Sequence, residues 1–407
     1  MKAQLFFILA FVCLGEVVHY SDVLKAFKPK SEGAVIAILS LPLTRRLKKK
    51  LRARLLEEES ESASKLKARI DPGEQENLEV DLKDQEAYVG EDGEDLEIQT
   101  NNLDGASFFP ASYARWLEEA GATVVPLEFH LDSHSLMSVL RKSDGLLLTG
   151  GAAPLFSNDV RTHHDNLLSS AVLTRVPSRY SQKAAELLKF AEELNKTRRF
   201  PVWATCLGFE AMVLREGAFE FPFNSVHNLN VNSPIDFVDP SKLKSIGDPA
   251  KELLSRLNPK QLEMMRSKNM FYFNHENAFL VSEYTGMSSL SKNFDILASA
   301  KTKNKHVVSP FVAVIAHKRL PFFGVQFHPE KTKFEPSAQE GLEDKATANE
   351  LSGTFAKFFV DLASHNTKGP SQRNLQDLNL NFEVSSVSKV GSFDSLYVFT
   401  KSTNILI

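Results

Sequence analysis

The chain has 407 residues, a formal net charge of −3, 43% hydrophobic residues and 24% charged residues. This balance is typical of a soluble globular protein with one large or two ordinary domains. A charge so close to neutral excludes the strongly basic class of proteins that bind nucleic acids through their overall charge.

Residues 1–20 have the pattern of a secretory signal peptide. Lys2 gives a short basic start, and the apolar run over residues 5–14 is too short to span a bilayer as a stable helix. We therefore expect targeting to the secretory pathway, and from there to a lysosome, a vacuole or the outside of the cell. A buried N-terminal strand or an uncleaved anchor is the alternative, and the cleavage position is open. No later stretch is long and apolar enough for a membrane span.

The next segments differ sharply in composition. Residues 33–41 are apolar almost throughout and predict a buried strand. In residues 44–105, a basic run is followed by a long acidic stretch, and such a segment cannot bury enough apolar surface to fold alone. We expect a charged, mobile insertion whose first part forms a helix with opposite charges one turn apart. A role in partner binding and clipping during maturation are both open.

Helices and strands alternate over most of the remaining chain. Apolar residues at helical spacing predict helices over residues 112–121, 135–142, 181–194 and 347–363. Apolar runs predict strands over residues 123–127, 144–151, 200–203, 270–273, 279–282, 294–298, 311–317 and 322–327.

This alternation predicts an α/β fold, a three-layer sandwich with a mostly parallel central sheet, in one domain over residues 33–365. Residues 152–178 are expected to form an irregular loop on the active side. Residues 366–407 are expected to be a polar tail that adds an edge strand or stays loose.

One cysteine remains once residues 1–20 are removed, because Cys13 leaves with them. Cys206 follows the apolar residues 200–203 and precedes Gly208 and a helix-like run. This is the layout of a nucleophile elbow, a tight turn that exposes a side chain above the sheet edge. In an oxidising compartment, a lone thiol is either buried and inert or reactive.

A second strand ends at His328, where Pro329 stops further pairing and Glu330 follows. An imidazole can take the proton of a thiol, and a carboxylate can orient that imidazole. Cys206, His328 and Glu330 therefore predict a triad that the fold brings together. Each signal taken singly is also compatible with inert packing.

Acyl transfer also requires donors for a developing oxyanion. The backbone N–H of Leu207, directly after the nucleophile, is one candidate. Gly151 is the other, because a glycine lets the backbone approach a substrate closely. The turn at Gly150 and Gly151 and the turn at Cys206 both follow predicted strands. In open α/β sheets, active sites lie beyond the carboxyl ends of the strands.

The chain resembles the gamma-glutamyl hydrolases, also called folylpolyglutamate hydrolases, a family with the class I glutamine amidotransferase-like fold. The resemblance covers most of residues 33–365 and is carried, in the family's order, by residues 112–122, 145–151, 200–210 and 323–331. The string Thr-Cys-Leu-Gly-Phe-Glu at residues 205–210 is its most specific part. The resemblance implies that Cys206 is the nucleophile, His328 the general base and acid, and Glu330 the group that orients His328.

The resemblance implies hydrolysis of gamma-linked glutamate chains on folates by a cysteine omega peptidase, through a thioester and without a metal or other cofactor. It also implies that His275, in Phe-Asn-His-Glu, positions the substrate or assists the leaving group, and that Gly150 lies in the substrate site. The alternative for His275 is a histidine on a surface loop. Because polyglutamate is anionic, we expect nearby positive charge, for which the candidates are Arg161, Arg175, Arg179 and Lys331.

The adjacent His163, His164 and Asp165 are not accompanied by a complete ligand set, so we expect a solvated loop there and no metal site. The chain departs from the family in three ways: Ala204 stands where glycine is usual, the insertion is longer, and the family's additional cysteines are missing.

Two alternative functions remain. A glutaminase subunit of an amidotransferase would share the triad, but the signal peptide and the lack of a synthase region argue against it. A non-catalytic binding protein of the same fold is disfavoured by the intact Cys206, His328 and Glu330. The resemblance also implies a homodimer, whereas the choice between endo- and exo-cleavage is open.

Overall fold

The computed structural model describes residues 33–67, 103, 105–163, 172–217, 223–239, 246–284, 286–302, 309–365, 382–390 and 393–401. The chain divides into a larger unit, residues 27–41 and 109–378, and a smaller unit, residues 1–26, 42–108 and 379–407. The predicted signal peptide and the acidic stretch of the insertion lie outside the described residues. Within the described residues, no helix is both long enough and apolar enough to cross a membrane.

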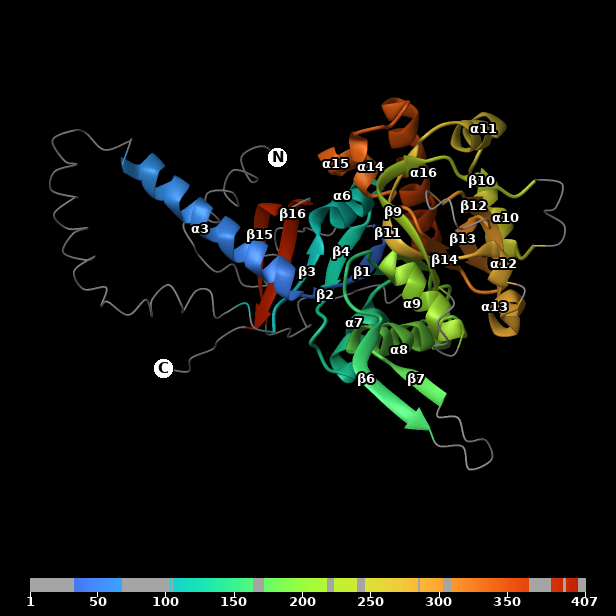
Figure 1. Ribbon diagram of the computed structural model, residues 1–407, viewed down its shortest axis with the longest axis horizontal. Helices are drawn as coiled ribbons and strands as arrows, with labels where there is room; N and C mark the ends of the chain where they lie inside the picture. Colours follow the sequence, from blue (N-terminus) through green and yellow to red (C-terminus); the bar gives the residue numbers. More distant parts are fainter. Residues whose placement is uncertain are drawn as a thin grey trace. The chain divides into compact units, whose positions relative to one another are not determined.

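An eight-stranded sheet forms the centre of the larger unit (Figure 1). In spatial order its strands are β10 (Asp236–Phe237), β12 (Phe294–Ala300), β13 (Phe311–His317), β14 (Phe322–Val325), β8 (Val202–Thr205), β5 (Gly145–Leu148), β1 (Val35–Leu39) and β4 (Thr123–Leu127). The five strands from β14 to β4 pair in parallel, and β13, β12 and β10 extend the sheet antiparallel. The predicted mostly parallel sheet is therefore confirmed.

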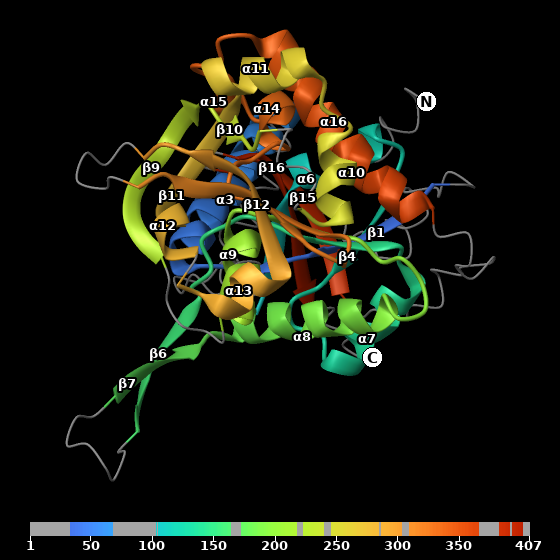
Figure 2. The same cartoon turned by 90° about the vertical axis from the view of Figure 1, so that its right-hand side faces the viewer.

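Helices cover both faces of this sheet, as Figure 2 shows. One face carries α7 (Ser133–Lys142), α8 (Arg179–Leu194) and α9 (Leu207–Glu216), and the other carries α6 (Ala111–Glu119) and α16 (Lys345–Ser364). Three of them start at a side chain that accepts a hydrogen bond from the first turn, namely Asp132, Ser178 and Asp344. The predicted three-layer α/β arrangement is confirmed.

Trp203 anchors the layer formed by α6 and α16. It lies in β8, is fully buried, and its ring packs against Trp116, Phe323, Phe355 and Phe359. Because aromatic side chains bury large areas, this cluster fixes both helices against the strand that leads to Cys206.

The prediction of two separate strands over residues 270–273 and 279–282 is wrong. One continuous strand, β11 (Phe271–Phe279), pairs antiparallel with β9 (Phe223–Ser233), and α12 (Val281–Tyr284) follows it. The polar middle of β11 obscures the strand in the sequence, but its pairing with β9 depends on backbone groups. Helices α10 (Asp248–Leu254) and α11 (Pro259–Ser267) lie between the two strands in sequence.

Residues 152–178 are not an irregular loop throughout, so this expectation is also wrong. They contain the antiparallel hairpin of β6 (Phe156–His163) and β7 (Val172–Pro177), which projects from the larger unit (Figures 1 and 2). Short helices complete this unit: α13 (Ser288–Asn293), α14 (Lys331–Phe334) and α15 (Pro336–Gln339).

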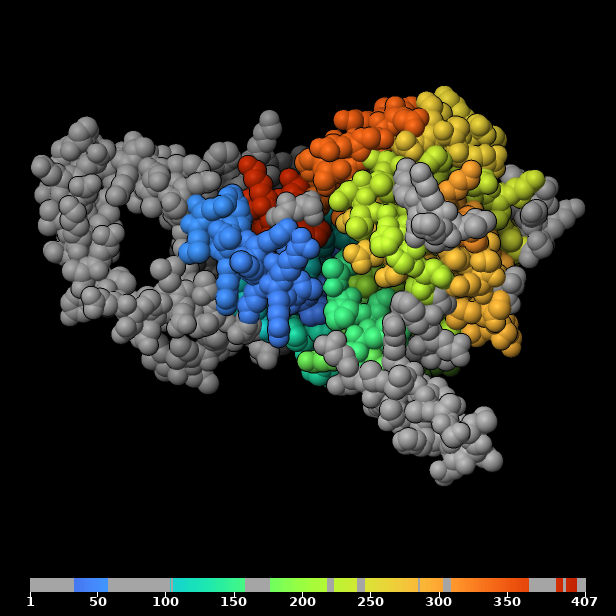
Figure 3. Space-filling view, viewed as in Figure 1, coloured from blue at the N-terminus to red at the C-terminus, as the bar shows by residue number. Residues whose placement is uncertain are grey.

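In the smaller unit, β15 (Phe382–Val390) pairs antiparallel with β16 (Phe393–Lys401). The boundaries between the two units fall inside the short strands β2 (Leu41–Pro42) and β3 (Ser107–Pro110). Helix α3 (Arg45–Lys67) contacts β15, and the Nε group of Arg54 donates a hydrogen bond to the Ser388 carbonyl. The basic start of α3 forms part of the surface in Figure 3, with four exposed side chains: Arg45, Arg46, Lys49 and Lys50.

Replacement of Phe355 by alanine should lower the free energy of unfolding by about 3–5 kcal/mol, because it leaves a cavity beside Trp203. Urea unfolding of the variant and the wild type measures this difference. The control is Lys357→Ala on the exposed side of the same helix, which should cost about 0.5 kcal/mol or less. Equal losses in the two variants would contradict the role of the cluster.

Candidate active site

Cys206 occupies a strained turn between β8 and α9. Its φ angle is 49°, an uncommon value for a residue with a side chain, and the residue is 4% exposed. Its N–H donates to the Val325 carbonyl at 2.8 Å. Two residues later, a Cβ added to Gly208 would lie 2.5 Å from the Leu148 carbonyl oxygen, so the turn requires glycine there. The backbone therefore has the geometry of a nucleophile elbow.

His328 and Glu330 follow the neighbouring parallel strand. Val325 of β14 is in register with Thr205 of β8, so both chains leave the sheet at the same edge. The His328 Nδ1 atom lies 2.8 Å from the Glu330 Oε1 atom, and the two side chains are 4% and 0% exposed. The carboxylate therefore fixes the orientation of the imidazole ring.

Gly150 lies between the thiol and the imidazole. A Cβ added there would be 2.6 Å from the Cε1 atom of His328 and 3.0 Å from the Cβ atom of Cys206. Cys206 and His328 therefore both lie next to this glycine, and Glu330 is held to the Nδ1 atom of the same imidazole. In the described part of the chain, no hydrogen bond joins the thiol directly to the ring. Such contacts often tighten only when a substrate binds.

The two candidate oxyanion donors, Leu207 and Gly151, have different surroundings. The Leu207 N–H faces the Cys206 sulfur and acts to lower its pKa. Gly151 is exposed, whereas the neighbouring Gly150 is buried and donates its N–H to the Tyr113 hydroxyl at 2.7 Å. The Gly150 N–H is therefore already engaged and does not point freely toward an incoming oxygen.

Tyr113 of α6 is a site residue that sequence reasoning missed. Its side chain is fully buried, and burial together with the negative charge of Glu330 raises the pKa of its hydroxyl. It therefore lies between the glycine turn and the triad carboxylate. The only signal was its place in residues 112–122, where a tyrosine on an amphipathic helix is most simply interpreted as a core residue.

Burial keeps the thiol and the imidazole neutral. It raises the pKa of the Cys206 thiol, and the charge of Glu210 acts in the same direction, while Lys331 opposes them. Burial lowers the pKa of His328, although the charge of Glu330 favours the protonated ring. Both shifts favour a neutral thiol and a neutral imidazole over a preformed ion pair.

His275 is buried on β11 and not on a surface loop. It is 5% exposed, and its Nδ1 atom lies 2.8 Å from the Asn277 carbonyl oxygen. Burial lowers the pKa of His275 to about 4, so the ring is neutral and its Nδ1 carries the proton that the carbonyl accepts. The Nε2 atom is left as a buried acceptor with no partner in the described residues.

Of the two cationic candidates whose side chains the structure describes, Lys331 is the one whose charge acts on Cys206. It is 6% exposed, its Nζ atom lies 5.3 Å from the centre of the Tyr272 ring, and its charge lowers the pKa of Cys206. Arg179 is exposed at the start of α8, and the side chains of Arg161 and Arg175 lie outside the described part.

The side chain of His163 and residues 164–165, which were considered for a metal site, also lie outside the described part. Across the described ranges, no cluster of three or more metal-binding side chains occurs.

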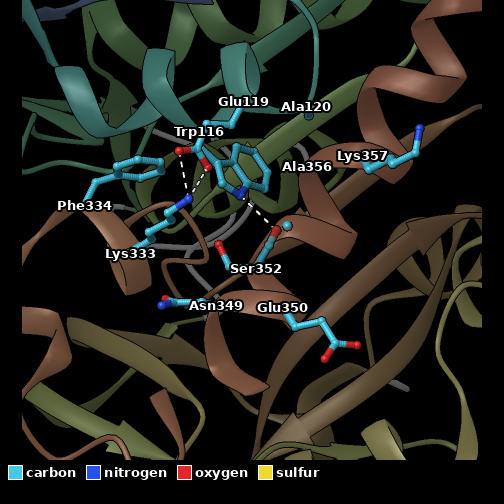
Figure 4. Close-up of a pocket in the computed structure, with 11 residues that line it drawn as sticks. Trp116, Glu119, Ala120, Lys333, Phe334, Asn349, Glu350, Ser352, Ala356 and Lys357 are labelled. Atoms are coloured by element: carbon cyan, nitrogen blue, oxygen red, sulfur yellow. Dashed lines mark hydrogen bonds and ion pairs between the residues drawn. The ribbon is translucent and has the colours of Figure 1, made fainter. Parts of the chain in front are cut away.

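A groove of about 360 Å³ lies between α6, α14 and α16 (Figure 4). Lys333 pairs with Glu119 beside it, and the Trp116 indole N–H donates to the Ser352 carbonyl. No triad residue lines it. The Ser352 hydroxyl donates to the carbonyl of Pro329, so this region supports the turn that carries His328 and Glu330.

Residues 109–347 match the family model for glutamine amidotransferase class-I. The chain belongs to this family. The gamma-glutamyl hydrolase of Rattus norvegicus is 27% identical over 298 residues, which is 72% of this chain and 84% of the relative. Gamma-glutamyl hydrolase 2 of Arabidopsis thaliana is 24% identical over 318 residues, 77% of this chain and 82% of the relative. The predicted resemblance to the gamma-glutamyl hydrolases is confirmed.

A solved structure of a candidate GMP synthase subunit from Thermoplasma acidophilum is also similar. It is 17% identical, with a TM-score of 0.37, and covers 63% of this chain and 89% of that one. The assignment to the family rests on the matched residues 109–347 and agrees with the sheet topology.

Replacement of Tyr113 by phenylalanine should lower the free energy of unfolding by about 1–3 kcal/mol, because the buried Gly150 N–H loses its acceptor. The matched control is Tyr180→Phe. The Tyr180 hydroxyl is buried without a hydrogen-bond partner in the described residues, so its removal should cost little. Urea unfolding compares the two, and a larger loss in the Tyr180 variant would rule out the predicted role.

His275 should make stability fall on acidification. Its folded-state pKa of about 4 lies below the ordinary 6.5, so between these pH values the unfolded chain binds a proton that the folded chain does not. The free energy of unfolding should therefore drop by about 3 kcal/mol from pH 6.5 to 4 through this residue alone. Urea unfolding at a series of pH values measures this dependence. His275→Gln should make the free energy of unfolding less dependent on pH, whereas replacement of the exposed His134 by glutamine should not. An equally steep profile in His275→Gln would refute this.

Proposed function

We propose that this chain is a cysteine-dependent hydrolase that cleaves the gamma-glutamyl bonds of folate poly-gamma-glutamates through a thioester on Cys206. The observation that carries the proposal is the strained turn at Cys206 beside the His328–Glu330 pair, which follows the adjacent parallel strand. The names of the similar curated proteins support the gamma-glutamyl bond. The folate part of the substrate follows from the family resemblance of the sequence.

In the first half of the reaction, the Cys206 sulfur attacks the carbonyl carbon of the gamma-amide, and the thiol proton passes to His328. The N–H groups of Leu207 and Gly151 hold the negative oxygen of the tetrahedral intermediate. His328 then gives the proton to the departing amine nitrogen. The carbon–nitrogen bond breaks, and the acyl group remains on sulfur as a thioester.

In the second half, His328 removes a proton from water, and the oxygen attacks the thioester carbonyl. The carbon–sulfur bond breaks, the product leaves with a new carboxyl group, and the proton returns to Cys206. Throughout, Glu330 stabilises the imidazolium that forms twice in the cycle. This cycle suits a resting pair that is neutral, because charge appears only in the presence of substrate.

Substrate recognition is assigned to His275, Gly150 and Lys331. The bare Nε2 atom of His275 can accept a hydrogen bond from a substrate N–H. Gly150 has no side chain to block the space between the thiol and the imidazole. Lys331 supplies the positive charge that an anionic polyglutamate requires.

We further propose that the chain is targeted to the secretory pathway, to act in a lysosome, a vacuole or outside the cell. The pattern of residues 1–20 supports this proposal. A homodimer stays a prediction from the family resemblance.

The decisive experiment measures glutamate release from a pteroyl poly-gamma-glutamate by the wild type and by Cys206→Ala. We expect the wild type to cleave and the variant to lose at least about a thousandfold in rate, because the nucleophile is absent. Product lengths distinguish endo- from exo-cleavage. A well-folded wild type that leaves the polyglutamate intact, or a fully active Cys206→Ala, would overturn the proposal.

Glutamine serves as the comparison substrate. Cys206-dependent release of ammonia from glutamine, without cleavage of the polyglutamate, would favour a glutaminase. An inert protein that still binds the polyglutamate would favour a binding function.

A further inference from the structure

Glu210 is a buried acid close to the candidate nucleophile. It lies one turn after Cys206 on α9, and its N–H donates to the Cys206 carbonyl at 2.9 Å. Its side chain is buried, and its hydrogen-bond partner is the amide of Gln326, whose Nε2 atom lies 3.1 Å from the carboxyl oxygen Oε1. Gln326 directly follows β14, so the contact joins α9 to the end of β14.

No cation lies within ion-pair distance of Glu210 in the described part of the chain. The groups that face it are the Tyr180 hydroxyl from α8, the Cys206 thiol at the start of α9 and the neutral Gln326 amide. A buried carboxyl group without a positive partner is more stable in its protonated form. Burial accordingly raises the pKa of Glu210 to about 8, against the weaker opposing effect of Gln326.

The same helix offers a contrasting carboxylate. Glu216 pairs with Arg215 and accepts a hydrogen bond from the Asn293 amide, so its negative charge is compensated. Glu210 has no such compensation. Among the charged neighbours of Cys206, Glu210 has the largest effect on the pKa of the thiol, and it raises this pKa. Glu330 acts in the same direction, and Lys331 opposes both.

We infer that Glu210 is a protonation switch for Cys206: the neutral acid permits attack by the sulfur, and loss of its proton suppresses attack and sets the alkaline limit of activity. The physical reason is the repulsion between two negative charges in a buried site, which disfavours both the thiolate and the negative tetrahedral intermediate. Glu210 is a positioning residue in this scheme, because it acts through Cys206. The inference rests on the proposed role of Cys206 as nucleophile.

The test compares the wild type with Glu210→Gln, which imitates the protonated acid. The alkylation rate of Cys206 by iodoacetamide is followed on its peptide by mass spectrometry from pH 6 to 9.5, because alkylation follows thiolate formation. At pH 9 we expect Glu210→Gln to react about tenfold faster than the wild type, and at pH 6 the two rates should agree within about twofold. In hydrolysis, kcat/KM of the wild type should decline above about pH 8, and the decline of the variant should move to higher pH.

Two further variants sharpen the test. Gln326→Met removes the donor that lowers the pKa of Glu210, so the alkaline decline of kcat/KM should also move to higher pH. This variant replaces Glu210→Gln in the test if Glu210→Gln does not fold. Glu216→Gln changes a carboxylate on the same helix that is already paired, and it should keep the wild-type profile.

Identical alkylation profiles in the wild type and Glu210→Gln would overturn the inference. Loss of hydrolysis at every pH with unchanged alkylation would also overturn it, because Glu210 would then act on the substrate. A faster Glu210→Gln alkylation at pH 9, in a protein whose wild type releases no glutamate, would uphold the control of the Cys206 thiol by Glu210 and overturn the proposed function together with the alkaline limit of its activity.

Discussion

The parallel pairing of β8 with β14 is the constraint on which the candidate site depends. The two strands run in register from Phe322 and Val202 to Val325 and Thr205, and the Cys206 N–H continues the pairing by donating to the Val325 carbonyl. Both chains then leave the sheet at the same edge. Cys206 and the His328–Glu330 pair are more than a hundred residues apart in sequence. The strand pairing, and not a direct bond between the thiol and the imidazole, therefore brings them close together.

The second constraint is the cost of charge in a buried site. Cys206, His328, Glu330 and Glu210 are all buried, and Lys331 is the cation whose charge acts on the thiol. Burial raises the pKa of Cys206 and of Glu210 and lowers that of His328, so the neutral form is favoured in each of these three groups. Negative charge can then be stabilised where it develops, by backbone donors beside the thiol, since these need no reorganisation.

The local patterns in the sequence identified the parallel strands, the helices and the turn at Cys206, because each depends on residues close together in the chain. The pairing of β9 with β11 was missed, because polar residues such as Asn274 lie in strands held by backbone bonds to a distant partner. Tyr113 was missed for a similar reason. Its hydroxyl has a role only because the fold brings the Gly150 N–H to it. The spacing of apolar residues in a helix predicts which face is buried, but it does not predict which group a buried hydroxyl will bind.

The structure also explains how Ala204 fits where the family usually has glycine. The positive φ angle belongs to Cys206, whereas Ala204 lies in the extended backbone of β8, where a methyl group causes no strain. Its partner in register on β14 is Gly324, and a Cβ added there would lie 2.6 Å from the Phe209 ring. Neighbours in register point to the same face of a sheet. The position therefore requires a small side chain under α9 and not the conformational freedom of glycine, so the strained turn and an alanine before it are compatible.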